Sequence, residues 1–290
     1  MSPATGAQPG RLGRFELDLY LYGLRVGLTL LGARRLNRAL RYLVQPVPYW
    51  RSLEYRLVWA AAGFQATDRV LDIGSPKLLS LYLADRVGAE VYSTDLEDYF
   101  VDEYTYLRQA RRLAPERLHV ETADGRALPY PDGWFSKVFS VSVIEHIPDH
   151  GDSECLREIA RVLAPGGSCF ITVPFSPTSR EDYQKPDFYW ARSSRPAGDG
   201  LVFFQRRYSE DDLRRRLIEP SGLEVTSQLY VGEKVFVDDQ DRDFSDAFPI
   251  TLMTSPAHPL IARLLHTEPS TSWRVLRKPL CAFLELRKPA

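Results

Sequence analysis

The sequence predicts an α/β fold in which a doubly wound, mostly parallel seven-stranded sheet carries a helical N-terminal extension and a lid-like insertion. Short apolar segments with strand character alternate with amphipathic segments along most of the chain, as βαβ units require. The first of these strands ends in the Asp-x-Gly turn at 72–74, where such sheets bind nucleotide-like ligands. The alternation stops at about 175–207, where a long stretch rich in Pro, Ser and Arg indicates a functional loop.

Length and composition are those of a globular protein. The 290 residues suffice for a sizeable core, and hydrophobic and charged residues make up 44% and 26% of them, close to the usual values. The formal net charge is −1, so no overall field favours nucleic acid. Cys155, Cys169 and Cys281 are scattered and odd in number, which indicates reduced core thiols and a cytoplasmic protein. Neither a membrane-spanning helix nor a signal peptide is expected, because charged residues interrupt every apolar stretch.

The N-terminal extension, residues 1–48, combines a polar start with a basic helical segment. Residues 1–13 are expected to be disordered. Residues 15–44 are expected to be helical, because leucines recur at spacings of three and four (Leu17, Leu21, Leu24, Leu28 and Leu31). Residues 1–60 hold nine Arg, no Lys and three acids. Two interpretations stay open: a helical cap on the main domain with a solvated basic face, or a basic amphipathic segment in peripheral contact with an anionic membrane.

The main domain, residues 49–290, is expected to begin with a helix followed by a strand and a second helix. The first helix is predicted over 50–62, and the first strand over 69–73. Ser75 suits the N-cap of the next helix, and Pro76 suits its first position, where a missing N–H costs nothing.

Further strands and helices follow in alternation, with insertions at about 175–207 and 235–275. Strands are expected at 89–94, 119–122, 136–143, 169–173, 223–230 and 281–286, and helices at 104–113, 153–163, from Ser209 and at 258–265. The aromatic stretch 183–204 is expected either to line a pocket for a large, partly apolar ligand or to pack the insertion onto the domain.

Four motifs occupy the ends and turns of these predicted strands. Residues 70–74 read Val-Leu-Asp-Ile-Gly, and Asp95 ends the second strand. Residues 123–125, Ala-Asp-Gly, precede a Leu-Pro-Tyr-Pro-Asp-Gly-Trp-Phe run, and residues 161–167 end in Pro-Gly-Gly before the fifth strand. In this order and spacing the motifs resemble those of the class I S-adenosylmethionine-dependent methyltransferases, in particular the small-molecule branch. The resemblance covers about 50–230 and the last strand.

The resemblance implies S-adenosylmethionine as the cofactor and a set of residues that bind it. Asp95 is expected to accept hydrogen bonds from the ribose hydroxyls and Asp124 one from the adenine amino group, with ordinary turn chemistry as the alternative for both. Gly74 is expected to let the backbone approach the methionine end of the cofactor. The other residues expected at the cofactor are Asp72, Ser75, Pro76, Leu96, Ala123, Gly125, Ser142 and Val143, with Arg51 near its carboxylate, and Tyr49, Trp50 and Tyr55 are expected to close the site.

The chain departs from the family's Asp-x-Gly-x-Gly-x-Gly loop at two positions. Pro76 and Leu78 stand where the family has its second and third glycines, which removes an N–H donor and adds bulk beside the cofactor. The helix N-terminus at Ser75 offers a compensating positive dipole to the cofactor's carboxylate. A non-catalytic binding protein that retains the fold is therefore one alternative.

The function that the resemblance implies is methyl transfer from S-adenosylmethionine to a small-molecule acceptor, with an oxygen acceptor favoured. His146, just past the fourth strand, is the candidate general base, against the alternative that it packs or caps the next turn, and His150 is a second candidate. Some relatives bind a metal here through Glu-x-x-Glu-His, but Ser142 stands at the first Glu position, so no metal is expected. The basic N-terminal segment suggests a lipid or membrane-associated acceptor as another alternative. The sequence identifies neither the acceptor nor the oligomeric state.

Overall fold

The computed structural model describes residues 13–74, 78–98, 100–185, 196, 200–235 and 250–290. Ser75 and Pro76, for which a helix start is predicted, lie outside these ranges, as do residues 1–12 of the segment predicted to be disordered.

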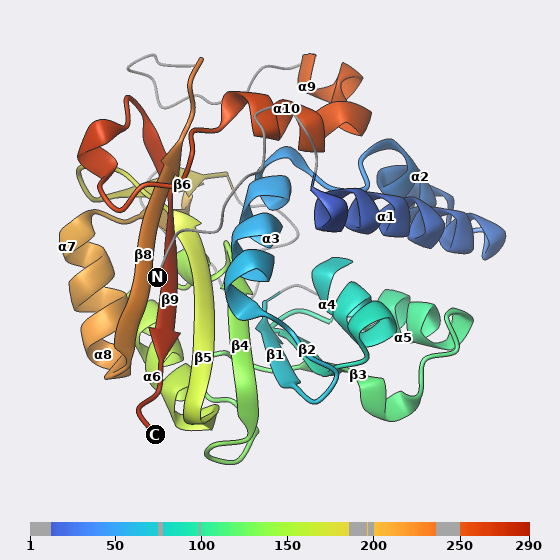
Figure 1. Ribbon diagram of the computed structural model, residues 1–290, viewed down its shortest axis with the longest axis horizontal. Helices are drawn as coiled ribbons and strands as arrows, with labels where there is room; N and C mark the ends of the chain where they lie inside the picture. The colour runs from blue at the N-terminus through green and yellow to red at the C-terminus, as the bar shows by residue number, and fades with distance from the viewer. Residues whose placement is uncertain (1–12, 75–77, 99, 186–195, 197–199, 236–249) are drawn as a thin grey trace.

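A seven-stranded sheet forms the centre of the molecule (Figure 1). Its strands are β1 (Arg69–Ile73), β2 (Glu90–Asp95), β3 (Leu118–Thr122), β4 (Phe135–Val141), β5 (Leu163–Pro174), β8 (Glu224–Gly232) and β9 (Pro279–Arg287). They are arranged in the order β3-β2-β1-β4-β5-β9-β8. The first five pair in parallel, and β9 runs antiparallel between β5 and β8. The predicted doubly wound, mostly parallel sheet is confirmed.

Helices cover both faces of the sheet. They are α1 (Arg14–Gly32), α2 (Leu36–Val44), α3 (Tyr49–Ala62), α4 (Leu78–Tyr82), α5 (Val101–Ala110), α6 (Gly151–Val162), α7 (Glu210–Asp212), α8 (Glu219–Ser221), α9 (Ile250–Met253) and α10 (His258–Leu265). Two hydrophobic clusters result: one joins α1, α3, α4 and α5 to strand residues such as Val70 and Phe139, and the other joins α6 and the α7–α8 region to Leu71 and Val138. Successive strand residues thus face opposite clusters, as the pleat of a sheet buried on both sides requires.

The N-terminal extension forms two helices instead of the single one predicted over 15–44. The chain turns between α1 and α2 at Arg34, whose φ of 59° lies in the left-handed region. The helices then pack closely: a Cβ placed on Gly27 of α1 would lie 2.9 Å from Cγ of Leu43 on α2. Leu19, Val26 and Leu30 of α1 belong to the same core cluster as α3–α5. The extension therefore caps one face of the domain.

The leucines that give α1 its helical pattern do not make this contact. Leu17, Leu21, Leu28 and Leu31 are between 42% and 59% exposed, whereas Leu19, Val26 and Leu30 are at most 2% exposed. A face offset from the leucine stripe is thus the packing face, and the outward face of α1 carries exposed leucines. Arg34 and Arg41 of the predicted basic segment are exposed too.

Two further segments differ from the prediction. The Pro-Gly-Gly turn predicted before the fifth strand is included in β5, which starts at Leu163 and shifts register against β4 between Phe135 and Lys137. The insertion at 175–207, which shows no strand pattern in sequence, contains the antiparallel hairpin β6 (Arg180–Gln184) and β7 (Val202–Arg207).

Helix α10, which belongs to the second insertion, packs against α3. Its C-terminal neighbour His266 is 2% exposed, and its ring lies 4.5 Å from that of Tyr49 and 4.7 Å from that of Trp50, centroid to centroid. Burial, followed by the charges of Arg56 and Lys234, lowers the pKa of His266 to about 3. The folded protein thus holds this imidazole neutral.

We predict a large difference in stability between two truncations on α1. Leu30 is fully buried and Leu28 is 59% exposed, so Leu30→Ala should lower the free energy of unfolding by about 2–5 kcal/mol because it leaves a cavity. Leu28→Ala should change it by less than about 0.5 kcal/mol. Urea denaturation of both variants measures this. Equal losses would contradict the packing of α1 described above.

We also predict that His266 makes the protein less stable in mild acid. The unfolded chain binds a proton at this histidine below about pH 6.5, whereas the folded protein binds it only near pH 3. Between about pH 7.5 and 5.5 the wild type should therefore lose about 1.4 kcal/mol of stability relative to His266→Phe. Denaturation at both pH values checks this, with exposed His150→Phe as the matched control. Parallel losses in wild type and His266→Phe would contradict it.

Candidate functional site

A cavity of about 790 Å³, here called the strand-end cavity, opens where β1–β4 end. Because β1 lies between β2 and β4, the chain reverses its direction of winding at this place, and α/β sheets bind their ligands there. The residues predicted at a cofactor that line it are Gly74, Asp95, Leu96, Ala123, Asp124, Gly125, Ser142, Val143 and Arg51, and His146 lines it too. Asn37, Arg38 and Arg41 of α2 and the neighbouring Arg126 also contribute, and the sequence did not indicate them.

The two aspartates combine turn geometry with exposure to this cavity. Asp95 Oδ1 accepts a hydrogen bond from the Glu97 N–H at 2.9 Å. Asp124 accepts the Arg126 N–H at 2.9 Å and three hydrogen bonds from its guanidinium, which holds the pKa of the Asp124 carboxyl below its usual value. Both aspartates thus hold their turns and also line the strand-end cavity.

Two features require a glycine at position 74: the conformation of its backbone and the closeness of the Val143 side chain. Its φ is 81°, and a Cβ there would overlap the side chain of Val143. The chain after β1 and the chain after β4 thus touch directly beneath the cavity.

Leu78 does not crowd the cavity, contrary to the expectation that it adds bulk beside the cofactor. It is buried in the core cluster of α1, and a Cβ on Gly23 of α1 would lie 3.0 Å from its Cδ2. The leucine at the family's third glycine position therefore packs against the N-terminal extension. Ser75 and Pro76 lie outside the described residues, so their predicted role stays a prediction.

Asp72 lies beneath the cavity instead of lining it. It is fully buried, and its Oδ2 accepts hydrogen bonds from Ser80 and, at 3.2 Å, from Ser93 on the adjacent strand. The side chain connects β1, β2 and α4. Its contacts are those of a residue that joins these three elements.

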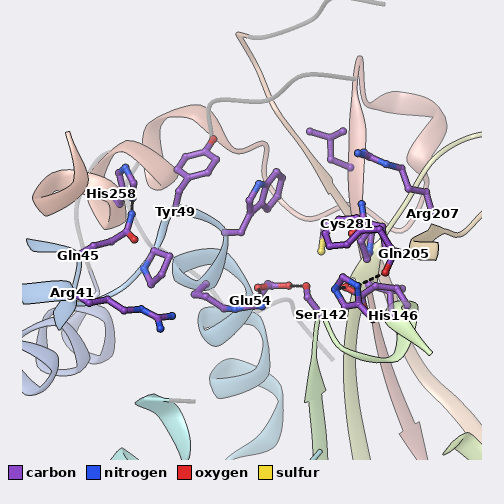
Figure 2. A pocket seen from close by; sticks show the side chains of 18 residues that line it. Arg41, Gln45, Tyr49, Glu54, Ser142, His146, Gln205, Arg207, His258 and Cys281 are labelled. Carbon is purple, nitrogen blue, oxygen red and sulfur yellow. Dashed lines mark hydrogen bonds and ion pairs between the residues drawn. The ribbon is translucent and has the colours of Figure 1, made fainter. Parts of the chain in front are cut away.

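A second cavity, of about 650 Å³, adjoins the first (Figure 2). Residues of α3, β5, β7, β9 and α10 form its walls, among them Trp50, Phe204 and Leu280. Arg41, Arg51, Ser142 and His146 line both cavities and so lie where the two adjoin. Its polar side chains include Gln45, which lies beside His258 and hydrogen-bonds it at 2.9 Å.

Glu54, which the sequence analysis missed, fixes the junction between the cavities. The carboxylate is 2% exposed and accepts hydrogen bonds from Arg51, from Ser142 and, at 2.9 Å, from Thr172. Ser142 itself has a φ of 47°. One signal was present in the sequence: Glu54 is the one acid of α3 and stands between Leu53 and Tyr55, both buried.

His146 lies in a short helical turn, Ile144–His146, with its side chain between the two cavities. Its Nδ1 lies 2.6 Å from the Phe204 carbonyl oxygen, and its Nε2 lies 3.8 Å from Oε1 of buried Glu145. A carbonyl only accepts, so Nδ1 carries the proton and Nε2 of the neutral ring holds the lone pair. This orientation suits a general base acting through Nε2.

The predicted aromatic residues divide between the second cavity, the core and the hairpin. Tyr49 and Trp50 line the second cavity and not the strand-end cavity, and Tyr55 is buried in the core. Tyr183 is 42% exposed, and its ring packs on that of Phe203 within the hairpin. Of the described residues of the aromatic stretch, Phe204 contributes to a cavity.

Other chemistries receive no support from the part of the chain that the structure describes. No three His, Cys, Asp or Glu side chains gather there as a metal ion would need. All three cysteines are buried and form no disulfide bond, and burial raises the pKa of the Cys155 thiol to about 12. None of the described helices has both the length and the apolar character to cross a bilayer.

Comparison with known proteins agrees with the geometry. Residues 71–171 match a family model described as a methyltransferase domain. The chain is 40% identical over 115 residues to the ubiquinone/menaquinone biosynthesis C-methyltransferase of Chromobacterium violaceum, a match that covers 38% of this chain and 44% of that protein. It is 29% identical over 187 residues to the 27-O-demethylrifamycin SV methyltransferase of Amycolatopsis mediterranei, covering 57% and 58%. The chain thus spans about half the length of these relatives.

Among solved structures, the cyclase SpnF is similar, with a TM-score of 0.55 and 19% identity over 83% of this chain and 81% of that one. At this identity the similarity concerns the fold alone. Sheet topology and domain match together agree with the resemblance found in the sequence, and with it S-adenosylmethionine as the cofactor. The chain thus contains a methyltransferase domain over residues 71–171, within a sheet that has the fold of the class I S-adenosylmethionine-dependent methyltransferases.

Proposed function

We propose that this protein transfers the methyl group of S-adenosylmethionine to a small molecule held in the second cavity. The observation that carries the proposal is the pair of adjoining cavities, which share Arg41, Arg51, Ser142 and His146. A methyltransferase needs two compartments that meet where donor and acceptor react. The strand-end cavity has the acidic residues at strand ends that suit a nucleoside, and the second cavity has the mixed lining that suits an organic acceptor.

In this proposal each wall of the strand-end cavity holds one part of the cofactor. Asp95 accepts from the ribose hydroxyls and Asp124 from the adenine amino group, with Leu96, Ala123, Gly125 and Val143 as apolar or backbone contacts. Arg51 lies where the cofactor's carboxylate would need a cation, although Glu54 already neutralises much of its charge. The cofactor supplies a methyl group already activated by its sulfonium, so the protein's contribution is to align the acceptor with it.

We favour an oxygen acceptor, and His146 is the group that supports this choice. An acceptor hydroxyl must lose its proton as it is methylated, and Nε2 of His146 is oriented to accept it at the junction of the cavities. A carbon acceptor is the competing possibility, because one relative is a C-methyltransferase by name.

A lipid or membrane-associated acceptor is a second candidate. The observation that favours it is the exposed apolar face of α1. The N-terminal extension that carries this face also contributes Arg41 to the lining of both cavities. Peripheral membrane contact through the N-terminal helix would bring such an acceptor to the cavity. The third possibility, a binding protein that kept the fold without the chemistry, is separated from these by cofactor titration and by turnover.

We predict that S-adenosylhomocysteine binds and that Asp95→Ala weakens binding about 10- to 100-fold, because a charge-assisted hydrogen bond contributes about 1.5–3 kcal/mol. Isothermal titration calorimetry measures this. Asp102→Ala, an exposed aspartate on α5, should bind like the wild type. No heat of binding in the wild type at millimolar ligand would refute the cofactor assignment.

We predict that His146→Gln lowers kcat about 10²- to 10⁴-fold and leaves cofactor affinity unchanged, as loss of a general base does. Tritiated S-adenosylmethionine and a panel of phenols, hydroxy acids and hydroxylated quinones provide the assay. His150→Gln, four residues on and exposed, is the control. If His146→Gln retains the turnover and pH profile of the wild type, the histidine has a packing role only.

A further inference from the structure

Helices α1, α2 and α10 lie near one another (Figure 1), and each has leucines that are exposed to solvent. The exposed apolar residues that define this surface, called the leucine surface below, are Leu17, Leu21, Leu28, Leu31, Leu36, Leu40, Val44, Leu260 and Leu264, each between 41% and 59% exposed. Single exposed leucines are ordinary, but a set that follows helical spacing on neighbouring helices indicates a binding surface.

The stripe on α1 is a regular second face of that helix. Leu17, Leu21, Leu28 and Leu31 follow one another at spacings of four, seven and three, so they lie on one side. The residues that pack on the domain, such as Leu19, Val26 and Leu30, lie on the opposite side. Packing on the domain thus leaves the leucine stripe without an occupant among the described residues.

The same two-sided arrangement occurs in α2. Leu36, Leu40 and Val44 recur every four residues and are exposed, whereas Asn37, Arg38 and Arg41 point to the strand-end cavity. Helix α2 therefore separates the leucine surface from the cavity that it helps to line.

Two contacts hold α10 beside this helix pair. Arg263 of α10 forms an ion pair with Glu16 of α1 at 2.6 Å, and both side chains are less than 10% exposed. Gln45, which follows α2, hydrogen-bonds His258 of α10 at 2.9 Å. Leu260 and Leu264 are exposed on α10, and His258 at its start lines the second cavity. Helices α2 and α10 thus each carry leucines of this surface and, at other positions, residues that line a cavity.

Charge identifies the occupant. Helices α1 and α2 and the turn that joins them carry six arginines against two acids, Glu16 and Asp18. Arg38 and Arg41 line the strand-end cavity, and Arg38 pairs with Glu103 at 2.6 Å, which leaves Arg14, Arg25, Arg34 and Arg35 outside it. Glu16 is neutralised by Arg263, and Asp18 lies 3.9 Å from Arg14. Arg25 and Arg34 are exposed. Leucines with arginines around them are the composition by which helices lie in the interface of an anionic bilayer.

We propose that α1, α2 and α10 together dock this protein onto an anionic membrane surface, with the leucine surface immersed among the lipid head groups. The cavities then open beside the bilayer. The docking surface is independent of the proposed chemistry, and only the delivery of an amphiphilic acceptor to the second cavity rests on that chemistry.

Co-sedimentation with vesicles tests the proposal. The full chain should bind vesicles of phosphatidylcholine and phosphatidylglycerol in equal parts and bind pure phosphatidylcholine more weakly. The triple variant Leu17→Gln, Leu21→Gln, Leu28→Gln should lose about 10- to 100-fold in partitioning. Arg25→Gln with Arg34→Gln should lose about tenfold on the anionic vesicles alone. Val225→Gln with Val275→Gln, which removes exposed apolar side chains outside α1, α2 and α10, is the matched control and should bind as the wild type does.

Three outcomes would overturn the proposal: no binding of the wild type to anionic vesicles, unchanged binding of the leucine variant, or a dimer in light scattering that the leucine variant abolishes while vesicles do not bind. Titration of the leucine variant with S-adenosylhomocysteine accompanies each assay. If the leucine variant still binds the cofactor but no longer binds vesicles, the result supports the docking surface. If it binds neither, the variant is misfolded, and the single variant Leu28→Gln takes its place. Vesicle binding and cofactor titration thus succeed or fail separately, so the docking surface and the proposed function are tested apart.

Discussion

The buried carboxylate of Glu54 is the constraint on which the arrangement of the site depends. An ionised group inside a protein is costly unless its charge is balanced and its oxygens are hydrogen-bonded. Arg51, Ser142 and Thr172 meet this requirement together, and they come from α3 and from the ends of β4 and β5. The orientation of α3 against the sheet is therefore set at this carboxylate. The left-handed backbone of Ser142 fits the same explanation, because such a conformation persists where its surroundings determine it.

The position of the strand-end cavity follows from sheet topology, whereas its closure follows from parts outside the sheet. Four parallel strands bring their carboxyl ends to one edge, and that alone gathers Gly74, Asp95, Asp124 and Val143. The opposite walls come from α2 and α3, which precede the first strand in the chain. The strand-end cavity is thus closed by α2 of the N-terminal extension and by α3.

This division explains how much the sequence could predict. Strand ends carry motifs that are local in sequence, so Asp95, Asp124 and the turn at Gly74 could be expected near one another, and they do line one cavity. The second cavity brings together Arg41, Phe204, His258 and Leu280, which are distant in sequence and carry no common motif. Which face of α1 packs on the domain could not be predicted, for another reason. Both faces of that helix are apolar, and periodicity alone does not tell which of two apolar faces packs on the domain. The hairpin β6–β7 escaped notice because its strands are short and rich in charged residues.

The contact between Gly23 and Leu78 has a thermodynamic consequence. Leu78 begins the helix after the predicted cofactor loop, and it packs into α1, whose other side bears the exposed leucines. Helix α1 therefore contacts the helix that follows the predicted cofactor loop, and its other side carries the leucines proposed to meet a bilayer. If a bilayer changes the affinity for the cofactor by some factor, the cofactor must change the affinity for the bilayer by the same factor. That coupling is one quantity, and it can be measured from either side.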